Sequence, residues 1–470
     1  MSEDMGKTTR EVFAPNGGAD SLPVPEEAVA AIRALEDAGF ESWVVGGFVR
    51  DSLLGAKAAD VDIATQARWT QAQEVFEERG WRTHETGTAH GTLTVIVGDR
   101  AMEVTTFRAD GPYEDGRHPS RVDFVSTIDE DLARRDFTVN ALAYHPARGL
   151  RDPFGGLDDL QKGVIRTVGE PQKRFSEDAL RILRACRFVA QLGFSIEERT
   201  YRGMCMGKGM LGLISMERIR HELNVLLTSP HAGKAIMETA DVLSAVLPEL
   251  VAMKGFDQHT PHHIYDVLEH TAHVVDGVPA TELLRWAALF HDMGKPAAFF
   301  FDENERGHFK GHPMISAQLA DGVMRRLGMS RSFANRVLEL VRRHDQPIEA
   351  SHRAVRRTLM SLDGDVDLTR GLFELKRADA LAQAPSSMGR LELAEELLEI
   401  LDEVVAEGEA FSMGDLAVTG RDVMELGVPE GPLVGRALEE ALDAVVDGRV
   451  ENDEAALKAF LAEWSEGHRS

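Results

Sequence analysis

Two aspartates that alternate with aliphatic residues, Asp60-Val61-Asp62-Ile63, restrict the fold of this chain more than any other feature. A period of two predicts a strand on which Asp60 and Asp62 share one face while Val61 and Ile63 face a core. Two carboxylates on one face repel each other unless cations lie between them. The segment therefore predicts either a cation-binding strand face or an exposed strand edge.

A glycine pair lies about 13 residues before these aspartates. Gly46-Gly47 follows a predicted strand over Trp43–Val45 and precedes a predicted helix over residues 48–54. Glycine lets phosphates approach the backbone, the start of a helix favours anions, and Arg50 can bind a triphosphate through two hydrogen bonds. Alone, the pair is equally consistent with a tight turn. Together with the two aspartates it predicts a nucleotide-binding unit.

The aspartate pair fits the chemistry of phosphoryl transfer. Enzymes of that kind hold two divalent ions about 3.5–4 Å apart between carboxylates, which stabilises the attacking and leaving oxygens. Ligands that are all oxygen favour Mg²⁺. We expect Asp60 and Asp62 to be the catalytic metal ligands, with Glu103 on a later strand as a third carboxylate.

The predicted elements change character along the chain. Residues 22–160 alternate helix and strand patterns and include a hairpin formed by Thr92–Val97 and Met102–Phe107. From about residue 170 the pattern is nearly all helical, and one helix is predicted over Phe175–Leu192 with Ser176 as its cap. These patterns predict the α+β class, with a mixed-sheet head followed by all-α domains.

Composition excludes some classes of protein. No apolar run reaches the roughly 18 residues that span a membrane, and residues 1–21 lack the apolar stretch of a signal peptide, so we expect a disordered lead-in. Two cysteines, Cys186 and Cys205, without zinc-binding spacing fit a reducing cytoplasm. The net charge of −26 argues only weakly against nucleic-acid binding, because residues 391–470 account for −16 of it and residues 162–187 carry +4.

Five motifs occur in an order that is typical of one enzyme family. They are Gly46-Gly47-Phe48-Val49-Arg50-Asp51 followed by Asp60-Val61-Asp62, Glu103-Val104-Thr105-Thr106-Phe107-Arg108, Arg134-Arg135-Asp136-Phe137-Thr138-Val139-Asn140-Ala141, Asp152-Pro153-Phe154-Gly155-Gly156, and Glu177-Asp178-Ala179-Leu180-Arg181. Over roughly residues 25–230 the chain resembles the class II CCA-adding tRNA nucleotidyltransferases and their bacterial poly(A) polymerase relatives. The resemblance implies a polymerase beta-like nucleotidyltransferase head.

Arg181, Arg184 and Arg187 recur every three residues after Asp178. Such a stripe of charge is by itself more typical of a salt-bridged solvent face. The resemblance implies instead that Asp178 and Arg181 hydrogen-bond the Watson–Crick edge of CTP or ATP, as an acceptor and a forked donor can. It also implies nucleotide-binding roles for Gly46, Gly47, Arg50, Arg135, Asp136, Asn140, Arg184 and Arg187.

Ten of the 17 histidines fall between His259 and His352. His291-Asp292 ends an apolar helix over Leu283–Phe290, where a buried imidazole and carboxylate would be costly without a partner. This region resembles the HD phosphohydrolase superfamily, which implies metal ligands at His270, His291, Asp292, His312, His344 and Asp379, with His263 as a rival to His270. Mixed His and Asp ligation suits Mn, Fe, Co or Ni. The alternative is a relic domain that binds metal weakly or only supports RNA.

We therefore expect five segments. They are a disordered lead-in (1–21), a nucleotidyltransferase head (22–160), a helical neck that reads the base and binds RNA (161–235), an HD metal-binding helical domain (236–385) and an acidic helical tail (386–470). The role of the tail is not determined by the sequence, which allows contact with tRNA, packing against another domain, or dimerisation.

The expected activity is template-independent addition of C, C and A to the tRNA 3′ end. The substrates would be CTP and ATP, and the reaction would need two Mg²⁺ ions. We expect no membrane partner, and HD phosphohydrolase activity would be a second function. The alternatives are a poly(A) polymerase, an enzyme that adds only A to tRNA, and a protein that acts mainly as an HD phosphohydrolase.

Overall fold

The computed structural model describes residues 22–57, 60–87, 91–110, 122–260, 264–384, 388–406 and 413–467. The predicted lead-in and His263 lie outside these residues. The chain divides into two compact units, Met1–Pro248 and Glu249–Ser470, which are described separately. None of the helices in the described ranges is long and apolar enough to cross a membrane.

Unit 1 is built on a seven-stranded mixed sheet with the strand order β3-β4-β5-β2-β1-β8-β9. Only β2 and β5 pair in parallel, because the other neighbours within this sheet are antiparallel. The mixed sheet predicted for the head is confirmed. The strands are β1 (Ser42–Val45), β2 (Asp62–Thr65), β3 (Arg82–Gly87), β4 (Thr92–Val97), β5 (Arg100–Thr106), β8 (Ala143–His145) and β9 (Gly149–Arg151), with small pairs formed by β6 (Arg108–Asp110) and β7 (Val122–Phe124) and by β10 (Val164–Ile165) and β11 (Ser195–Ile196).

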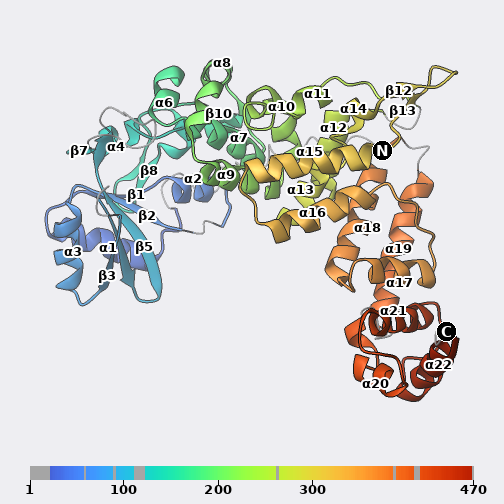
Figure 1. The fold of residues 1–470 in the computed structure, drawn as a ribbon. Coiled ribbons are helices and arrows are strands. Elements are labelled where there is room, and N and C mark those ends of the chain that lie inside the picture. Colours follow the sequence, from blue (N-terminus) through green and yellow to red (C-terminus); the bar gives the residue numbers. More distant parts are fainter. Residues whose placement is uncertain are drawn as a thin grey trace. The chain divides into compact units, whose positions relative to one another are not determined.

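Both faces of this sheet are covered. Helices α1 (Glu26–Asp37) and α3 (Trp69–Glu77) pack on one face, as Figure 1 shows, and bury Leu35 and Phe76. Trp43 and Ala64 belong to a second core, together with Phe107 and Leu132. Helix α2 (Gly47–Leu53) follows β1 directly.

Asp62 is the first residue of β2. It lies at an end of the strand rather than within a core.

The rest of unit 1 is mainly helical, but the single helix predicted over Phe175–Leu192 is wrong. One helix ends at Glu177 and the next begins at Leu180. Between them Asp178 is extended, and its Oδ1 accepts a hydrogen bond from the backbone N–H of Leu180. Ser176 is not a cap, since its hydroxyl donates to a carbonyl inside the first helix. The helices are α4 (Ile128–Ala133), η2 (Thr138–Asn140), α5 (Gly156–Lys162), α6 (Pro171–Glu177), α7 (Leu180–Leu192), α8 (Glu198–Gly207), η3 (Lys208–Leu213), α9 (Met216–Thr228) and α10 (Ala232–Leu243).

In the part of unit 2 that the structure describes, the chain is helical apart from a short hairpin. Its centre is α13 (Glu282–Phe290), which buries Trp286 and Phe290 and packs against α12, α15, α16 and α18. This packing fixes the residues that follow α13, where His291 and Asp292 lie. The other elements are α11 (Leu250–Met253), α12 (Val267–Gly277), α14 (Lys295–Ala298), β12 (Phe300–Phe301), β13 (Gly307–His308), α15 (His312–Arg326), α16 (Arg331–Arg343), α17 (His352–Ser361), α18 (Val366–Leu381) and α19 (Met388–Ala406).

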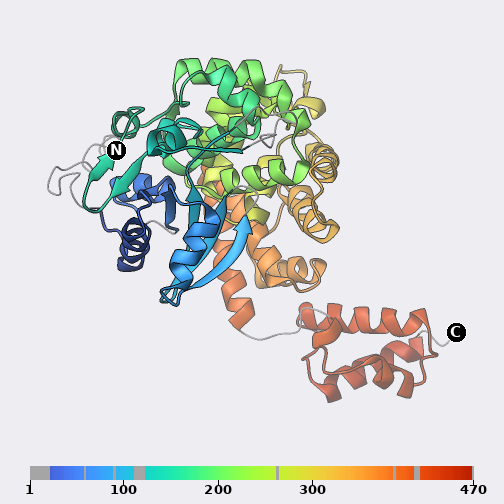
Figure 2. The ribbon, with the colours of Figure 1, turned by 90° about the vertical axis from the view of Figure 1, so that its left-hand side faces the viewer.

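The last helices of unit 2 enclose a small core of their own, seen as the red bundle in Figure 2. Val423, Ala437 and Leu457 are among its fully buried residues. The helices are η5 (Met413–Asp415), α20 (Gly420–Glu425), α21 (Pro432–Val446) and α22 (Glu454–Gly467). The boundaries predicted after residues 160 and 235 fall inside α5 and α10.

Candidate functional site

Three carboxylates gather where the sequence predicts a cation-binding strand face. Asp62 lies opposite Glu103 in the parallel pairing of β2 with β5, so the two side chains project from the same face of the sheet. Asp60 comes just before the strand and is exposed, whereas Val61 and Ile63 are 3% and 1% exposed. The alternation of acidic and core residues is therefore present, and the strand register places Glu103 beside Asp62.

The charges of these acids act on one another. Burial raises the pKa of Asp62 above its ordinary value, and the negative charges of Glu103 and Asp60 raise it further, while Arg135 lowers it. Carboxylates that repel one another in this way favour a divalent cation with oxygen ligands between them. The oxygen donors of these acids are thus of the kind that a divalent cation prefers.

The predicted glycine loop lies against this face. Gly46 has a φ of +72°, which glycine adopts without strain. A Cβ at Gly46 would lie 2.9 Å from Arg135 Nη1 and 4.0 Å from Asp62 Oδ2. Gly47 begins α2 and lies near Arg50 on the next turn. Any larger residue at position 46 would therefore displace the guanidinium that faces the carboxylates.

A hydrogen-bonded chain connects Arg50 to Arg184 through Asn140 and Asp136. Arg50 Nη1 donates to Asn140 Oδ1 at 2.7 Å, and Asn140 Nδ2 donates to Asp136 Oδ1 at 3.2 Å. Arg184 donates twice to Asp136 Oδ2, at 2.6 and 2.8 Å. Burial alone would raise the pKa of Asp136, but the charge and hydrogen bonds of Arg184 hold that pKa well below its ordinary range. Arg50 is also paired with Asp51 at 2.7 Å.

Asp178 and Arg181, which are predicted to read the base, have separate partners. Arg181 Nη1 donates to Glu177 Oε2 at 2.6 Å and to the Arg174 carbonyl at 3.0 Å. Asp178 Oδ2 accepts from Arg218 Nη2 at 3.0 Å. The i, i+4 spacing of Glu177 and Arg181 is a signal that could have identified their pairing. Arg218 lies 40 residues beyond Asp178 and carries no local signal.

Arg187 forms a largely buried ion pair with Glu222 of α9, in which Nε and Oε2 are 3.2 Å apart. Burial lowers the pKa of Arg187 and raises the pKa of Glu222. Glu222 is a second residue of this region that sequence patterns do not identify. Hydrogen bonds thus join Arg50 of the head to Arg184 of α7, whereas Arg187 is held by a separate partner.

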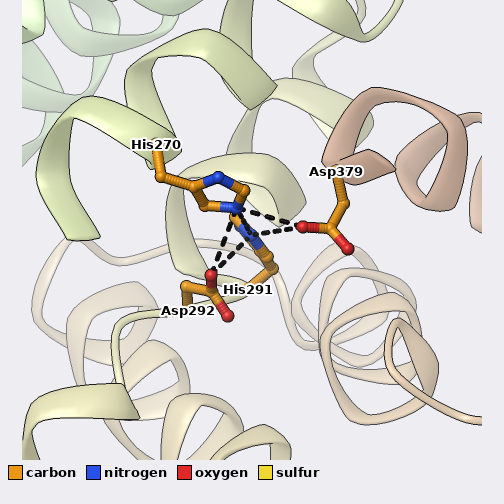
Figure 3. Close-up of side chains that lie close together, drawn as sticks. All are labelled: His270, His291, Asp292 and Asp379. Carbon is orange, nitrogen blue, oxygen red and sulfur yellow. Dashed lines mark hydrogen bonds and ion pairs between the residues drawn. The ribbon is translucent and has the colours of Figure 1, made fainter. Parts of the chain in front are cut away.

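Four buried side chains converge in unit 2, as Figure 3 shows. His270 comes from α12, His291 and Asp292 follow α13, and Asp379 comes from α18. His270 Nε2 lies 3.0 Å from Asp379 Oδ1 and 3.3 Å from Asp292 Oδ2, and His291 Nε2 lies 3.1 Å from the same Asp292 oxygen. Because ligand atoms of all four residues lie within 4.8 Å of one another, the group fits a metal ion.

A second group shares Asp292 with the first. His312 at the start of α15 and His344 at the end of α16 place their Nε2 atoms 3.2 and 3.7 Å from Asp292 Oδ1. Both Asp292 oxygens are buried and accept no hydrogen bond of regular geometry. Burial would raise the pKa of Asp292, but the positive charges of His291 and Lys295 hold it far below its ordinary value. The fold therefore brings together all six residues that the sequence suggested.

The backbone orients the four imidazoles of this HD centre. Each Nδ1 atom lies 2.6–3.2 Å from a backbone carbonyl, at Ala288, Phe309, Val341 and Ala382. A proton held on Nδ1 leaves Nε2 free to bind a metal, and a carbonyl partner fixes the plane of the ring. All four Nε2 atoms face the carboxylates, which is the arrangement that a metal centre needs.

An open hollow of about 680 Å³ adjoins the HD centre. Asp292, His312, His344 and Asp379 form part of its lining. Cationic side chains supply much of the rest, from Lys295, Arg306, Lys310 and Arg390. Cations beside metal ligands fit a substrate that carries a phosphate.

Three family models match the chain. Residues 42–166 match the poly A polymerase head domain, residues 193–253 match the probable RNA- and SrmB-binding site of polymerase A, and residues 261–384 match the HD domain. The head match contains Asp60, Asp62 and Glu103, and the HD match contains the six residues of the second centre. Domains of both kinds use divalent metal ions.

Named relatives extend over nearly the whole chain. The CCA-adding enzyme of Geobacillus stearothermophilus is 34% identical over 444 residues, which cover 94% of this chain and 97% of the relative. The crystal structure of the Bacillus stearothermophilus CCA-adding enzyme in complex with CTP has a TM-score of 0.70 at 30% identity and covers 94% of this chain and 98% of that one. The Thermotoga maritima CCA-adding enzyme complexed with tRNA_CCA shares the fold, with a TM-score of 0.54 at 23% identity. The match covers 94% of this chain and 96% of that one. The chain therefore belongs to the family of the CCA-adding enzymes, nucleotidyltransferases with a C-terminal HD domain.

Proposed function

We propose that this chain adds C, C and A, without a template, to the 3′ end of tRNA from CTP and ATP. The observation that carries the proposal is the facing of Asp62 and Glu103 across β2 and β5, with Asp60 beside them, in a chain that is 34% identical to a CCA-adding enzyme. A poly(A) polymerase or an A-only enzyme would need the same acids. Neither alternative is favoured, since the relatives that extend over 94% of the chain are named for CCA addition.

In the proposed mechanism Asp60 and Asp62 would hold two Mg²⁺ ions, with Glu103 as the third carboxylate. When bound, such ions stabilise negative charge on the attacking 3′-oxygen and on the pyrophosphate that leaves in line. Gly46 and Gly47 leave the backbone open to the phosphates. Guanidinium donors for the triphosphate come from Arg50, Arg135, Arg184 and Arg187, and Asp136 and Asn140 hold two of them in place.

Asp178 and Arg181 are proposed to select the base. Cytosine and adenine present an exocyclic amine beside a ring nitrogen, so a carboxylate can accept from the amine while a guanidinium donates to the nitrogen. Uracil and guanine present a carbonyl where the amine would be, so that the carbonyl oxygen would face the lone pairs of the carboxylate. The contacts of Arg181 with Glu177 and of Asp178 with Arg218 support the proposal, because they fix both side chains before a nucleotide binds.

Three tRNA transcripts test this function. They end before CCA, after C and after CC, and each is incubated with CTP, ATP, UTP or GTP alone. We expect C, C and A to be added in turn and UTP and GTP to be rejected. Addition of many A residues to every transcript would identify a poly(A) polymerase, and addition of A to the third transcript alone would identify an A-only enzyme.

A second activity, hydrolysis of a phosphoester, is proposed for the HD centre. The supporting observation is the convergence of four imidazole Nε2 atoms on Asp292 beside a hollow lined with cations. The His and Asp donors favour a transition metal such as Mn, Ni, Co or Fe. Replacing both His291 and Asp292 by Ala should abolish hydrolysis of a phosphoester panel and spare nucleotide addition. A wild-type protein that retains no transition metal and hydrolyses nothing would identify a relic domain.

The proposed domain order is head, neck, HD domain and tail, as the sequence predicts. Ending the head at the end of α5 and the neck at residue 248 keeps every helix intact and agrees with the division into two units. Both cysteines are free, which supports a reducing, cytoplasmic location.

A further inference from the structure

The aromatic ring of Phe188 contacts three residues of the proposed triphosphate site. Phe188 lies on α7 and is 4% exposed. From the ring centroid, the guanidinium carbon lies 4.8 Å away in Arg187, 5.3 Å away in Arg50 and 5.6 Å away in Arg184. A cation within about 6 Å of an aromatic ring face is attracted by the electron density of that face. One ring therefore attracts three guanidinium groups that belong to two different helices, α2 and α7.

Each arginine also has an acidic partner. Arg50 pairs with Asp51, Arg184 with Asp136 and Arg187 with Glu222. These acids offset the repulsion that three positive charges around one ring would otherwise cause. The chain through Asn140 and Asp136 links Arg50 to Arg184, but these contacts do not reach Arg187, which pairs with Glu222. The ring of Phe188 is a contact that all three share.

The orientation of the ring is itself fixed. Phe137 is fully buried and stands edge-on to Phe188, with ring centroids 5.6 Å apart and an interplanar angle of 80°. Phe137 lies next to Asp136, the partner of Arg184, and is paired in an isolated bridge with Thr167. A ring held in this way cannot turn its face from the arginines without disrupting the buried pair of phenylalanines.

We propose that Phe188 is a positioning residue for the triphosphate, whose ring keeps Arg50, Arg184 and Arg187 gathered for one polyanion before the nucleotide binds. The inference rests on the proposed function. Donors that are already in place lose less conformational freedom when the phosphates bind, so the effect falls on affinity for the triphosphate. Base selection by Asp178 and Arg181 does not depend on it.

The test compares variants that remove the aromatic ring of Phe188, keep it, or lower the electron density of its face. Phe188→Leu keeps apolar volume without an aromatic face and should raise KM for CTP and ATP about tenfold with a smaller change in kcat. Phe188→Tyr keeps the ring and should stay within about threefold of the wild type. Fluorinated phenylalanines at position 188 keep the shape but withdraw electrons from the face, so each added fluorine should weaken binding of inorganic tripolyphosphate further.

Phe76→Leu is the matched control, since Phe76 is a fully buried phenylalanine of the same unit and packs beside Trp81 instead. The proposal is overturned if Phe188→Leu changes KM no more than Phe76→Leu does, or if fluorination leaves tripolyphosphate binding unchanged. It is also overturned if Phe188→Leu alters the preference for CTP over UTP as strongly as it alters KM. A wild-type protein that binds tripolyphosphate through Phe188 but extends no RNA would instead contradict the proposed function alone.

Discussion

The head and the HD centre both gather carboxylates, but in opposite surroundings. In the head, Asp62 and Glu103 come from two paired strands, and Asp60 and Glu103 are exposed to solvent. In the HD centre the six residues come from α12, α15 and α18 and from the ends of α13 and α16, and all are buried. Water can screen the repulsion among the exposed head carboxylates, whereas the buried charge of Asp292 is offset by imidazoles and by Lys295.

Because of this difference, substitutions at the two sites should affect catalysis and stability differently. A ligand in the head can be lost without leaving a buried charge unpaired, so the effect should fall on catalysis. A ligand in the HD centre balances other buried charges, and its loss should affect metal binding and stability together.

The largest effect is expected for Asp62→Asn. Nucleotide addition should fall by about a thousandfold or more, because charge stabilisation by metal ions supplies most of the rate. The free energy of unfolding should stay near that of the wild type. Initial rates on a tRNA transcript that lacks CCA, together with urea unfolding, check both expectations. Asp99→Asn is the control, since Asp99 is an exposed acid on the turn between β4 and β5. Near-normal nucleotide addition by a folded Asp62→Asn protein would contradict the assignment of the head carboxylates as the catalytic site.

Asp292→Asn should lower the affinity of the HD centre for a transition metal by at least about 100-fold, because this carboxylate belongs to both ligand groups. The Tm of the metal-loaded protein should fall as well. Metal content after dialysis, measured beside thermal unfolding, gives both values, and nucleotide addition should remain near the wild-type rate. Asp345→Asn is the matched control, since Asp345 lines the hollow but belongs to neither group. Equal metal retention by the two variants would contradict the assignment.

The same contrast exists between two ion pairs of unit 1. Asp136→Asn should cost about 2 kcal/mol at neutral pH, since it removes the charge from a buried carboxylate whose Oδ2 accepts two hydrogen bonds from Arg184. Asp129→Asn should cost under about 1 kcal/mol, because Asp129 and Arg151 are exposed.

The contribution of Asp136 to stability should depend on pH, because Arg184 lowers the pKa of Asp136 in the folded state. The stabilisation by Asp136 is present above the unfolded value near pH 4 and is lost as the pH falls through the lower folded pKa. Chemical unfolding from pH 7 to pH 3 measures this, and a difference that grows on acidification would contradict it.

The smallest effect is expected for base selection. Asp178→Ala should reduce the preference for CTP over UTP about tenfold, because the carboxylate that would repel the uracil carbonyl is removed. Arg50→Ala should instead lower kcat/KM for all four nucleotides alike. The measurement is a set of kcat/KM values for CTP, ATP, UTP and GTP on one primer. If Asp178→Ala lowers all four equally, Asp178 has a structural role and the base-reading assignment fails.

The sequence by itself determined the local elements and the candidate chemistry. The alternation in Asp60–Ile63 defines a strand with an acidic face, and the hairpin of β4 and β5 follows from strand patterns around a turn. The apolar run before His291 defines a helix that ends at the metal-binding pair. These features can be predicted because backbone geometry sets the periods of helices and strands, and each side chain then follows from its place in the period.

Only the tertiary structure decided which distant residues meet. The parallel pairing of β2 with β5 brings Glu103 to Asp62, packing of α9 on α7 brings Arg218 to Asp178, and packing of α18 on α12 brings Asp379 to His270. The break at Asp178 is also visible only in the structure, because the apolar pattern runs through a residue whose backbone is extended. Such meetings depend on strand register and helix packing, which are set by the whole core and leave no period in the local sequence.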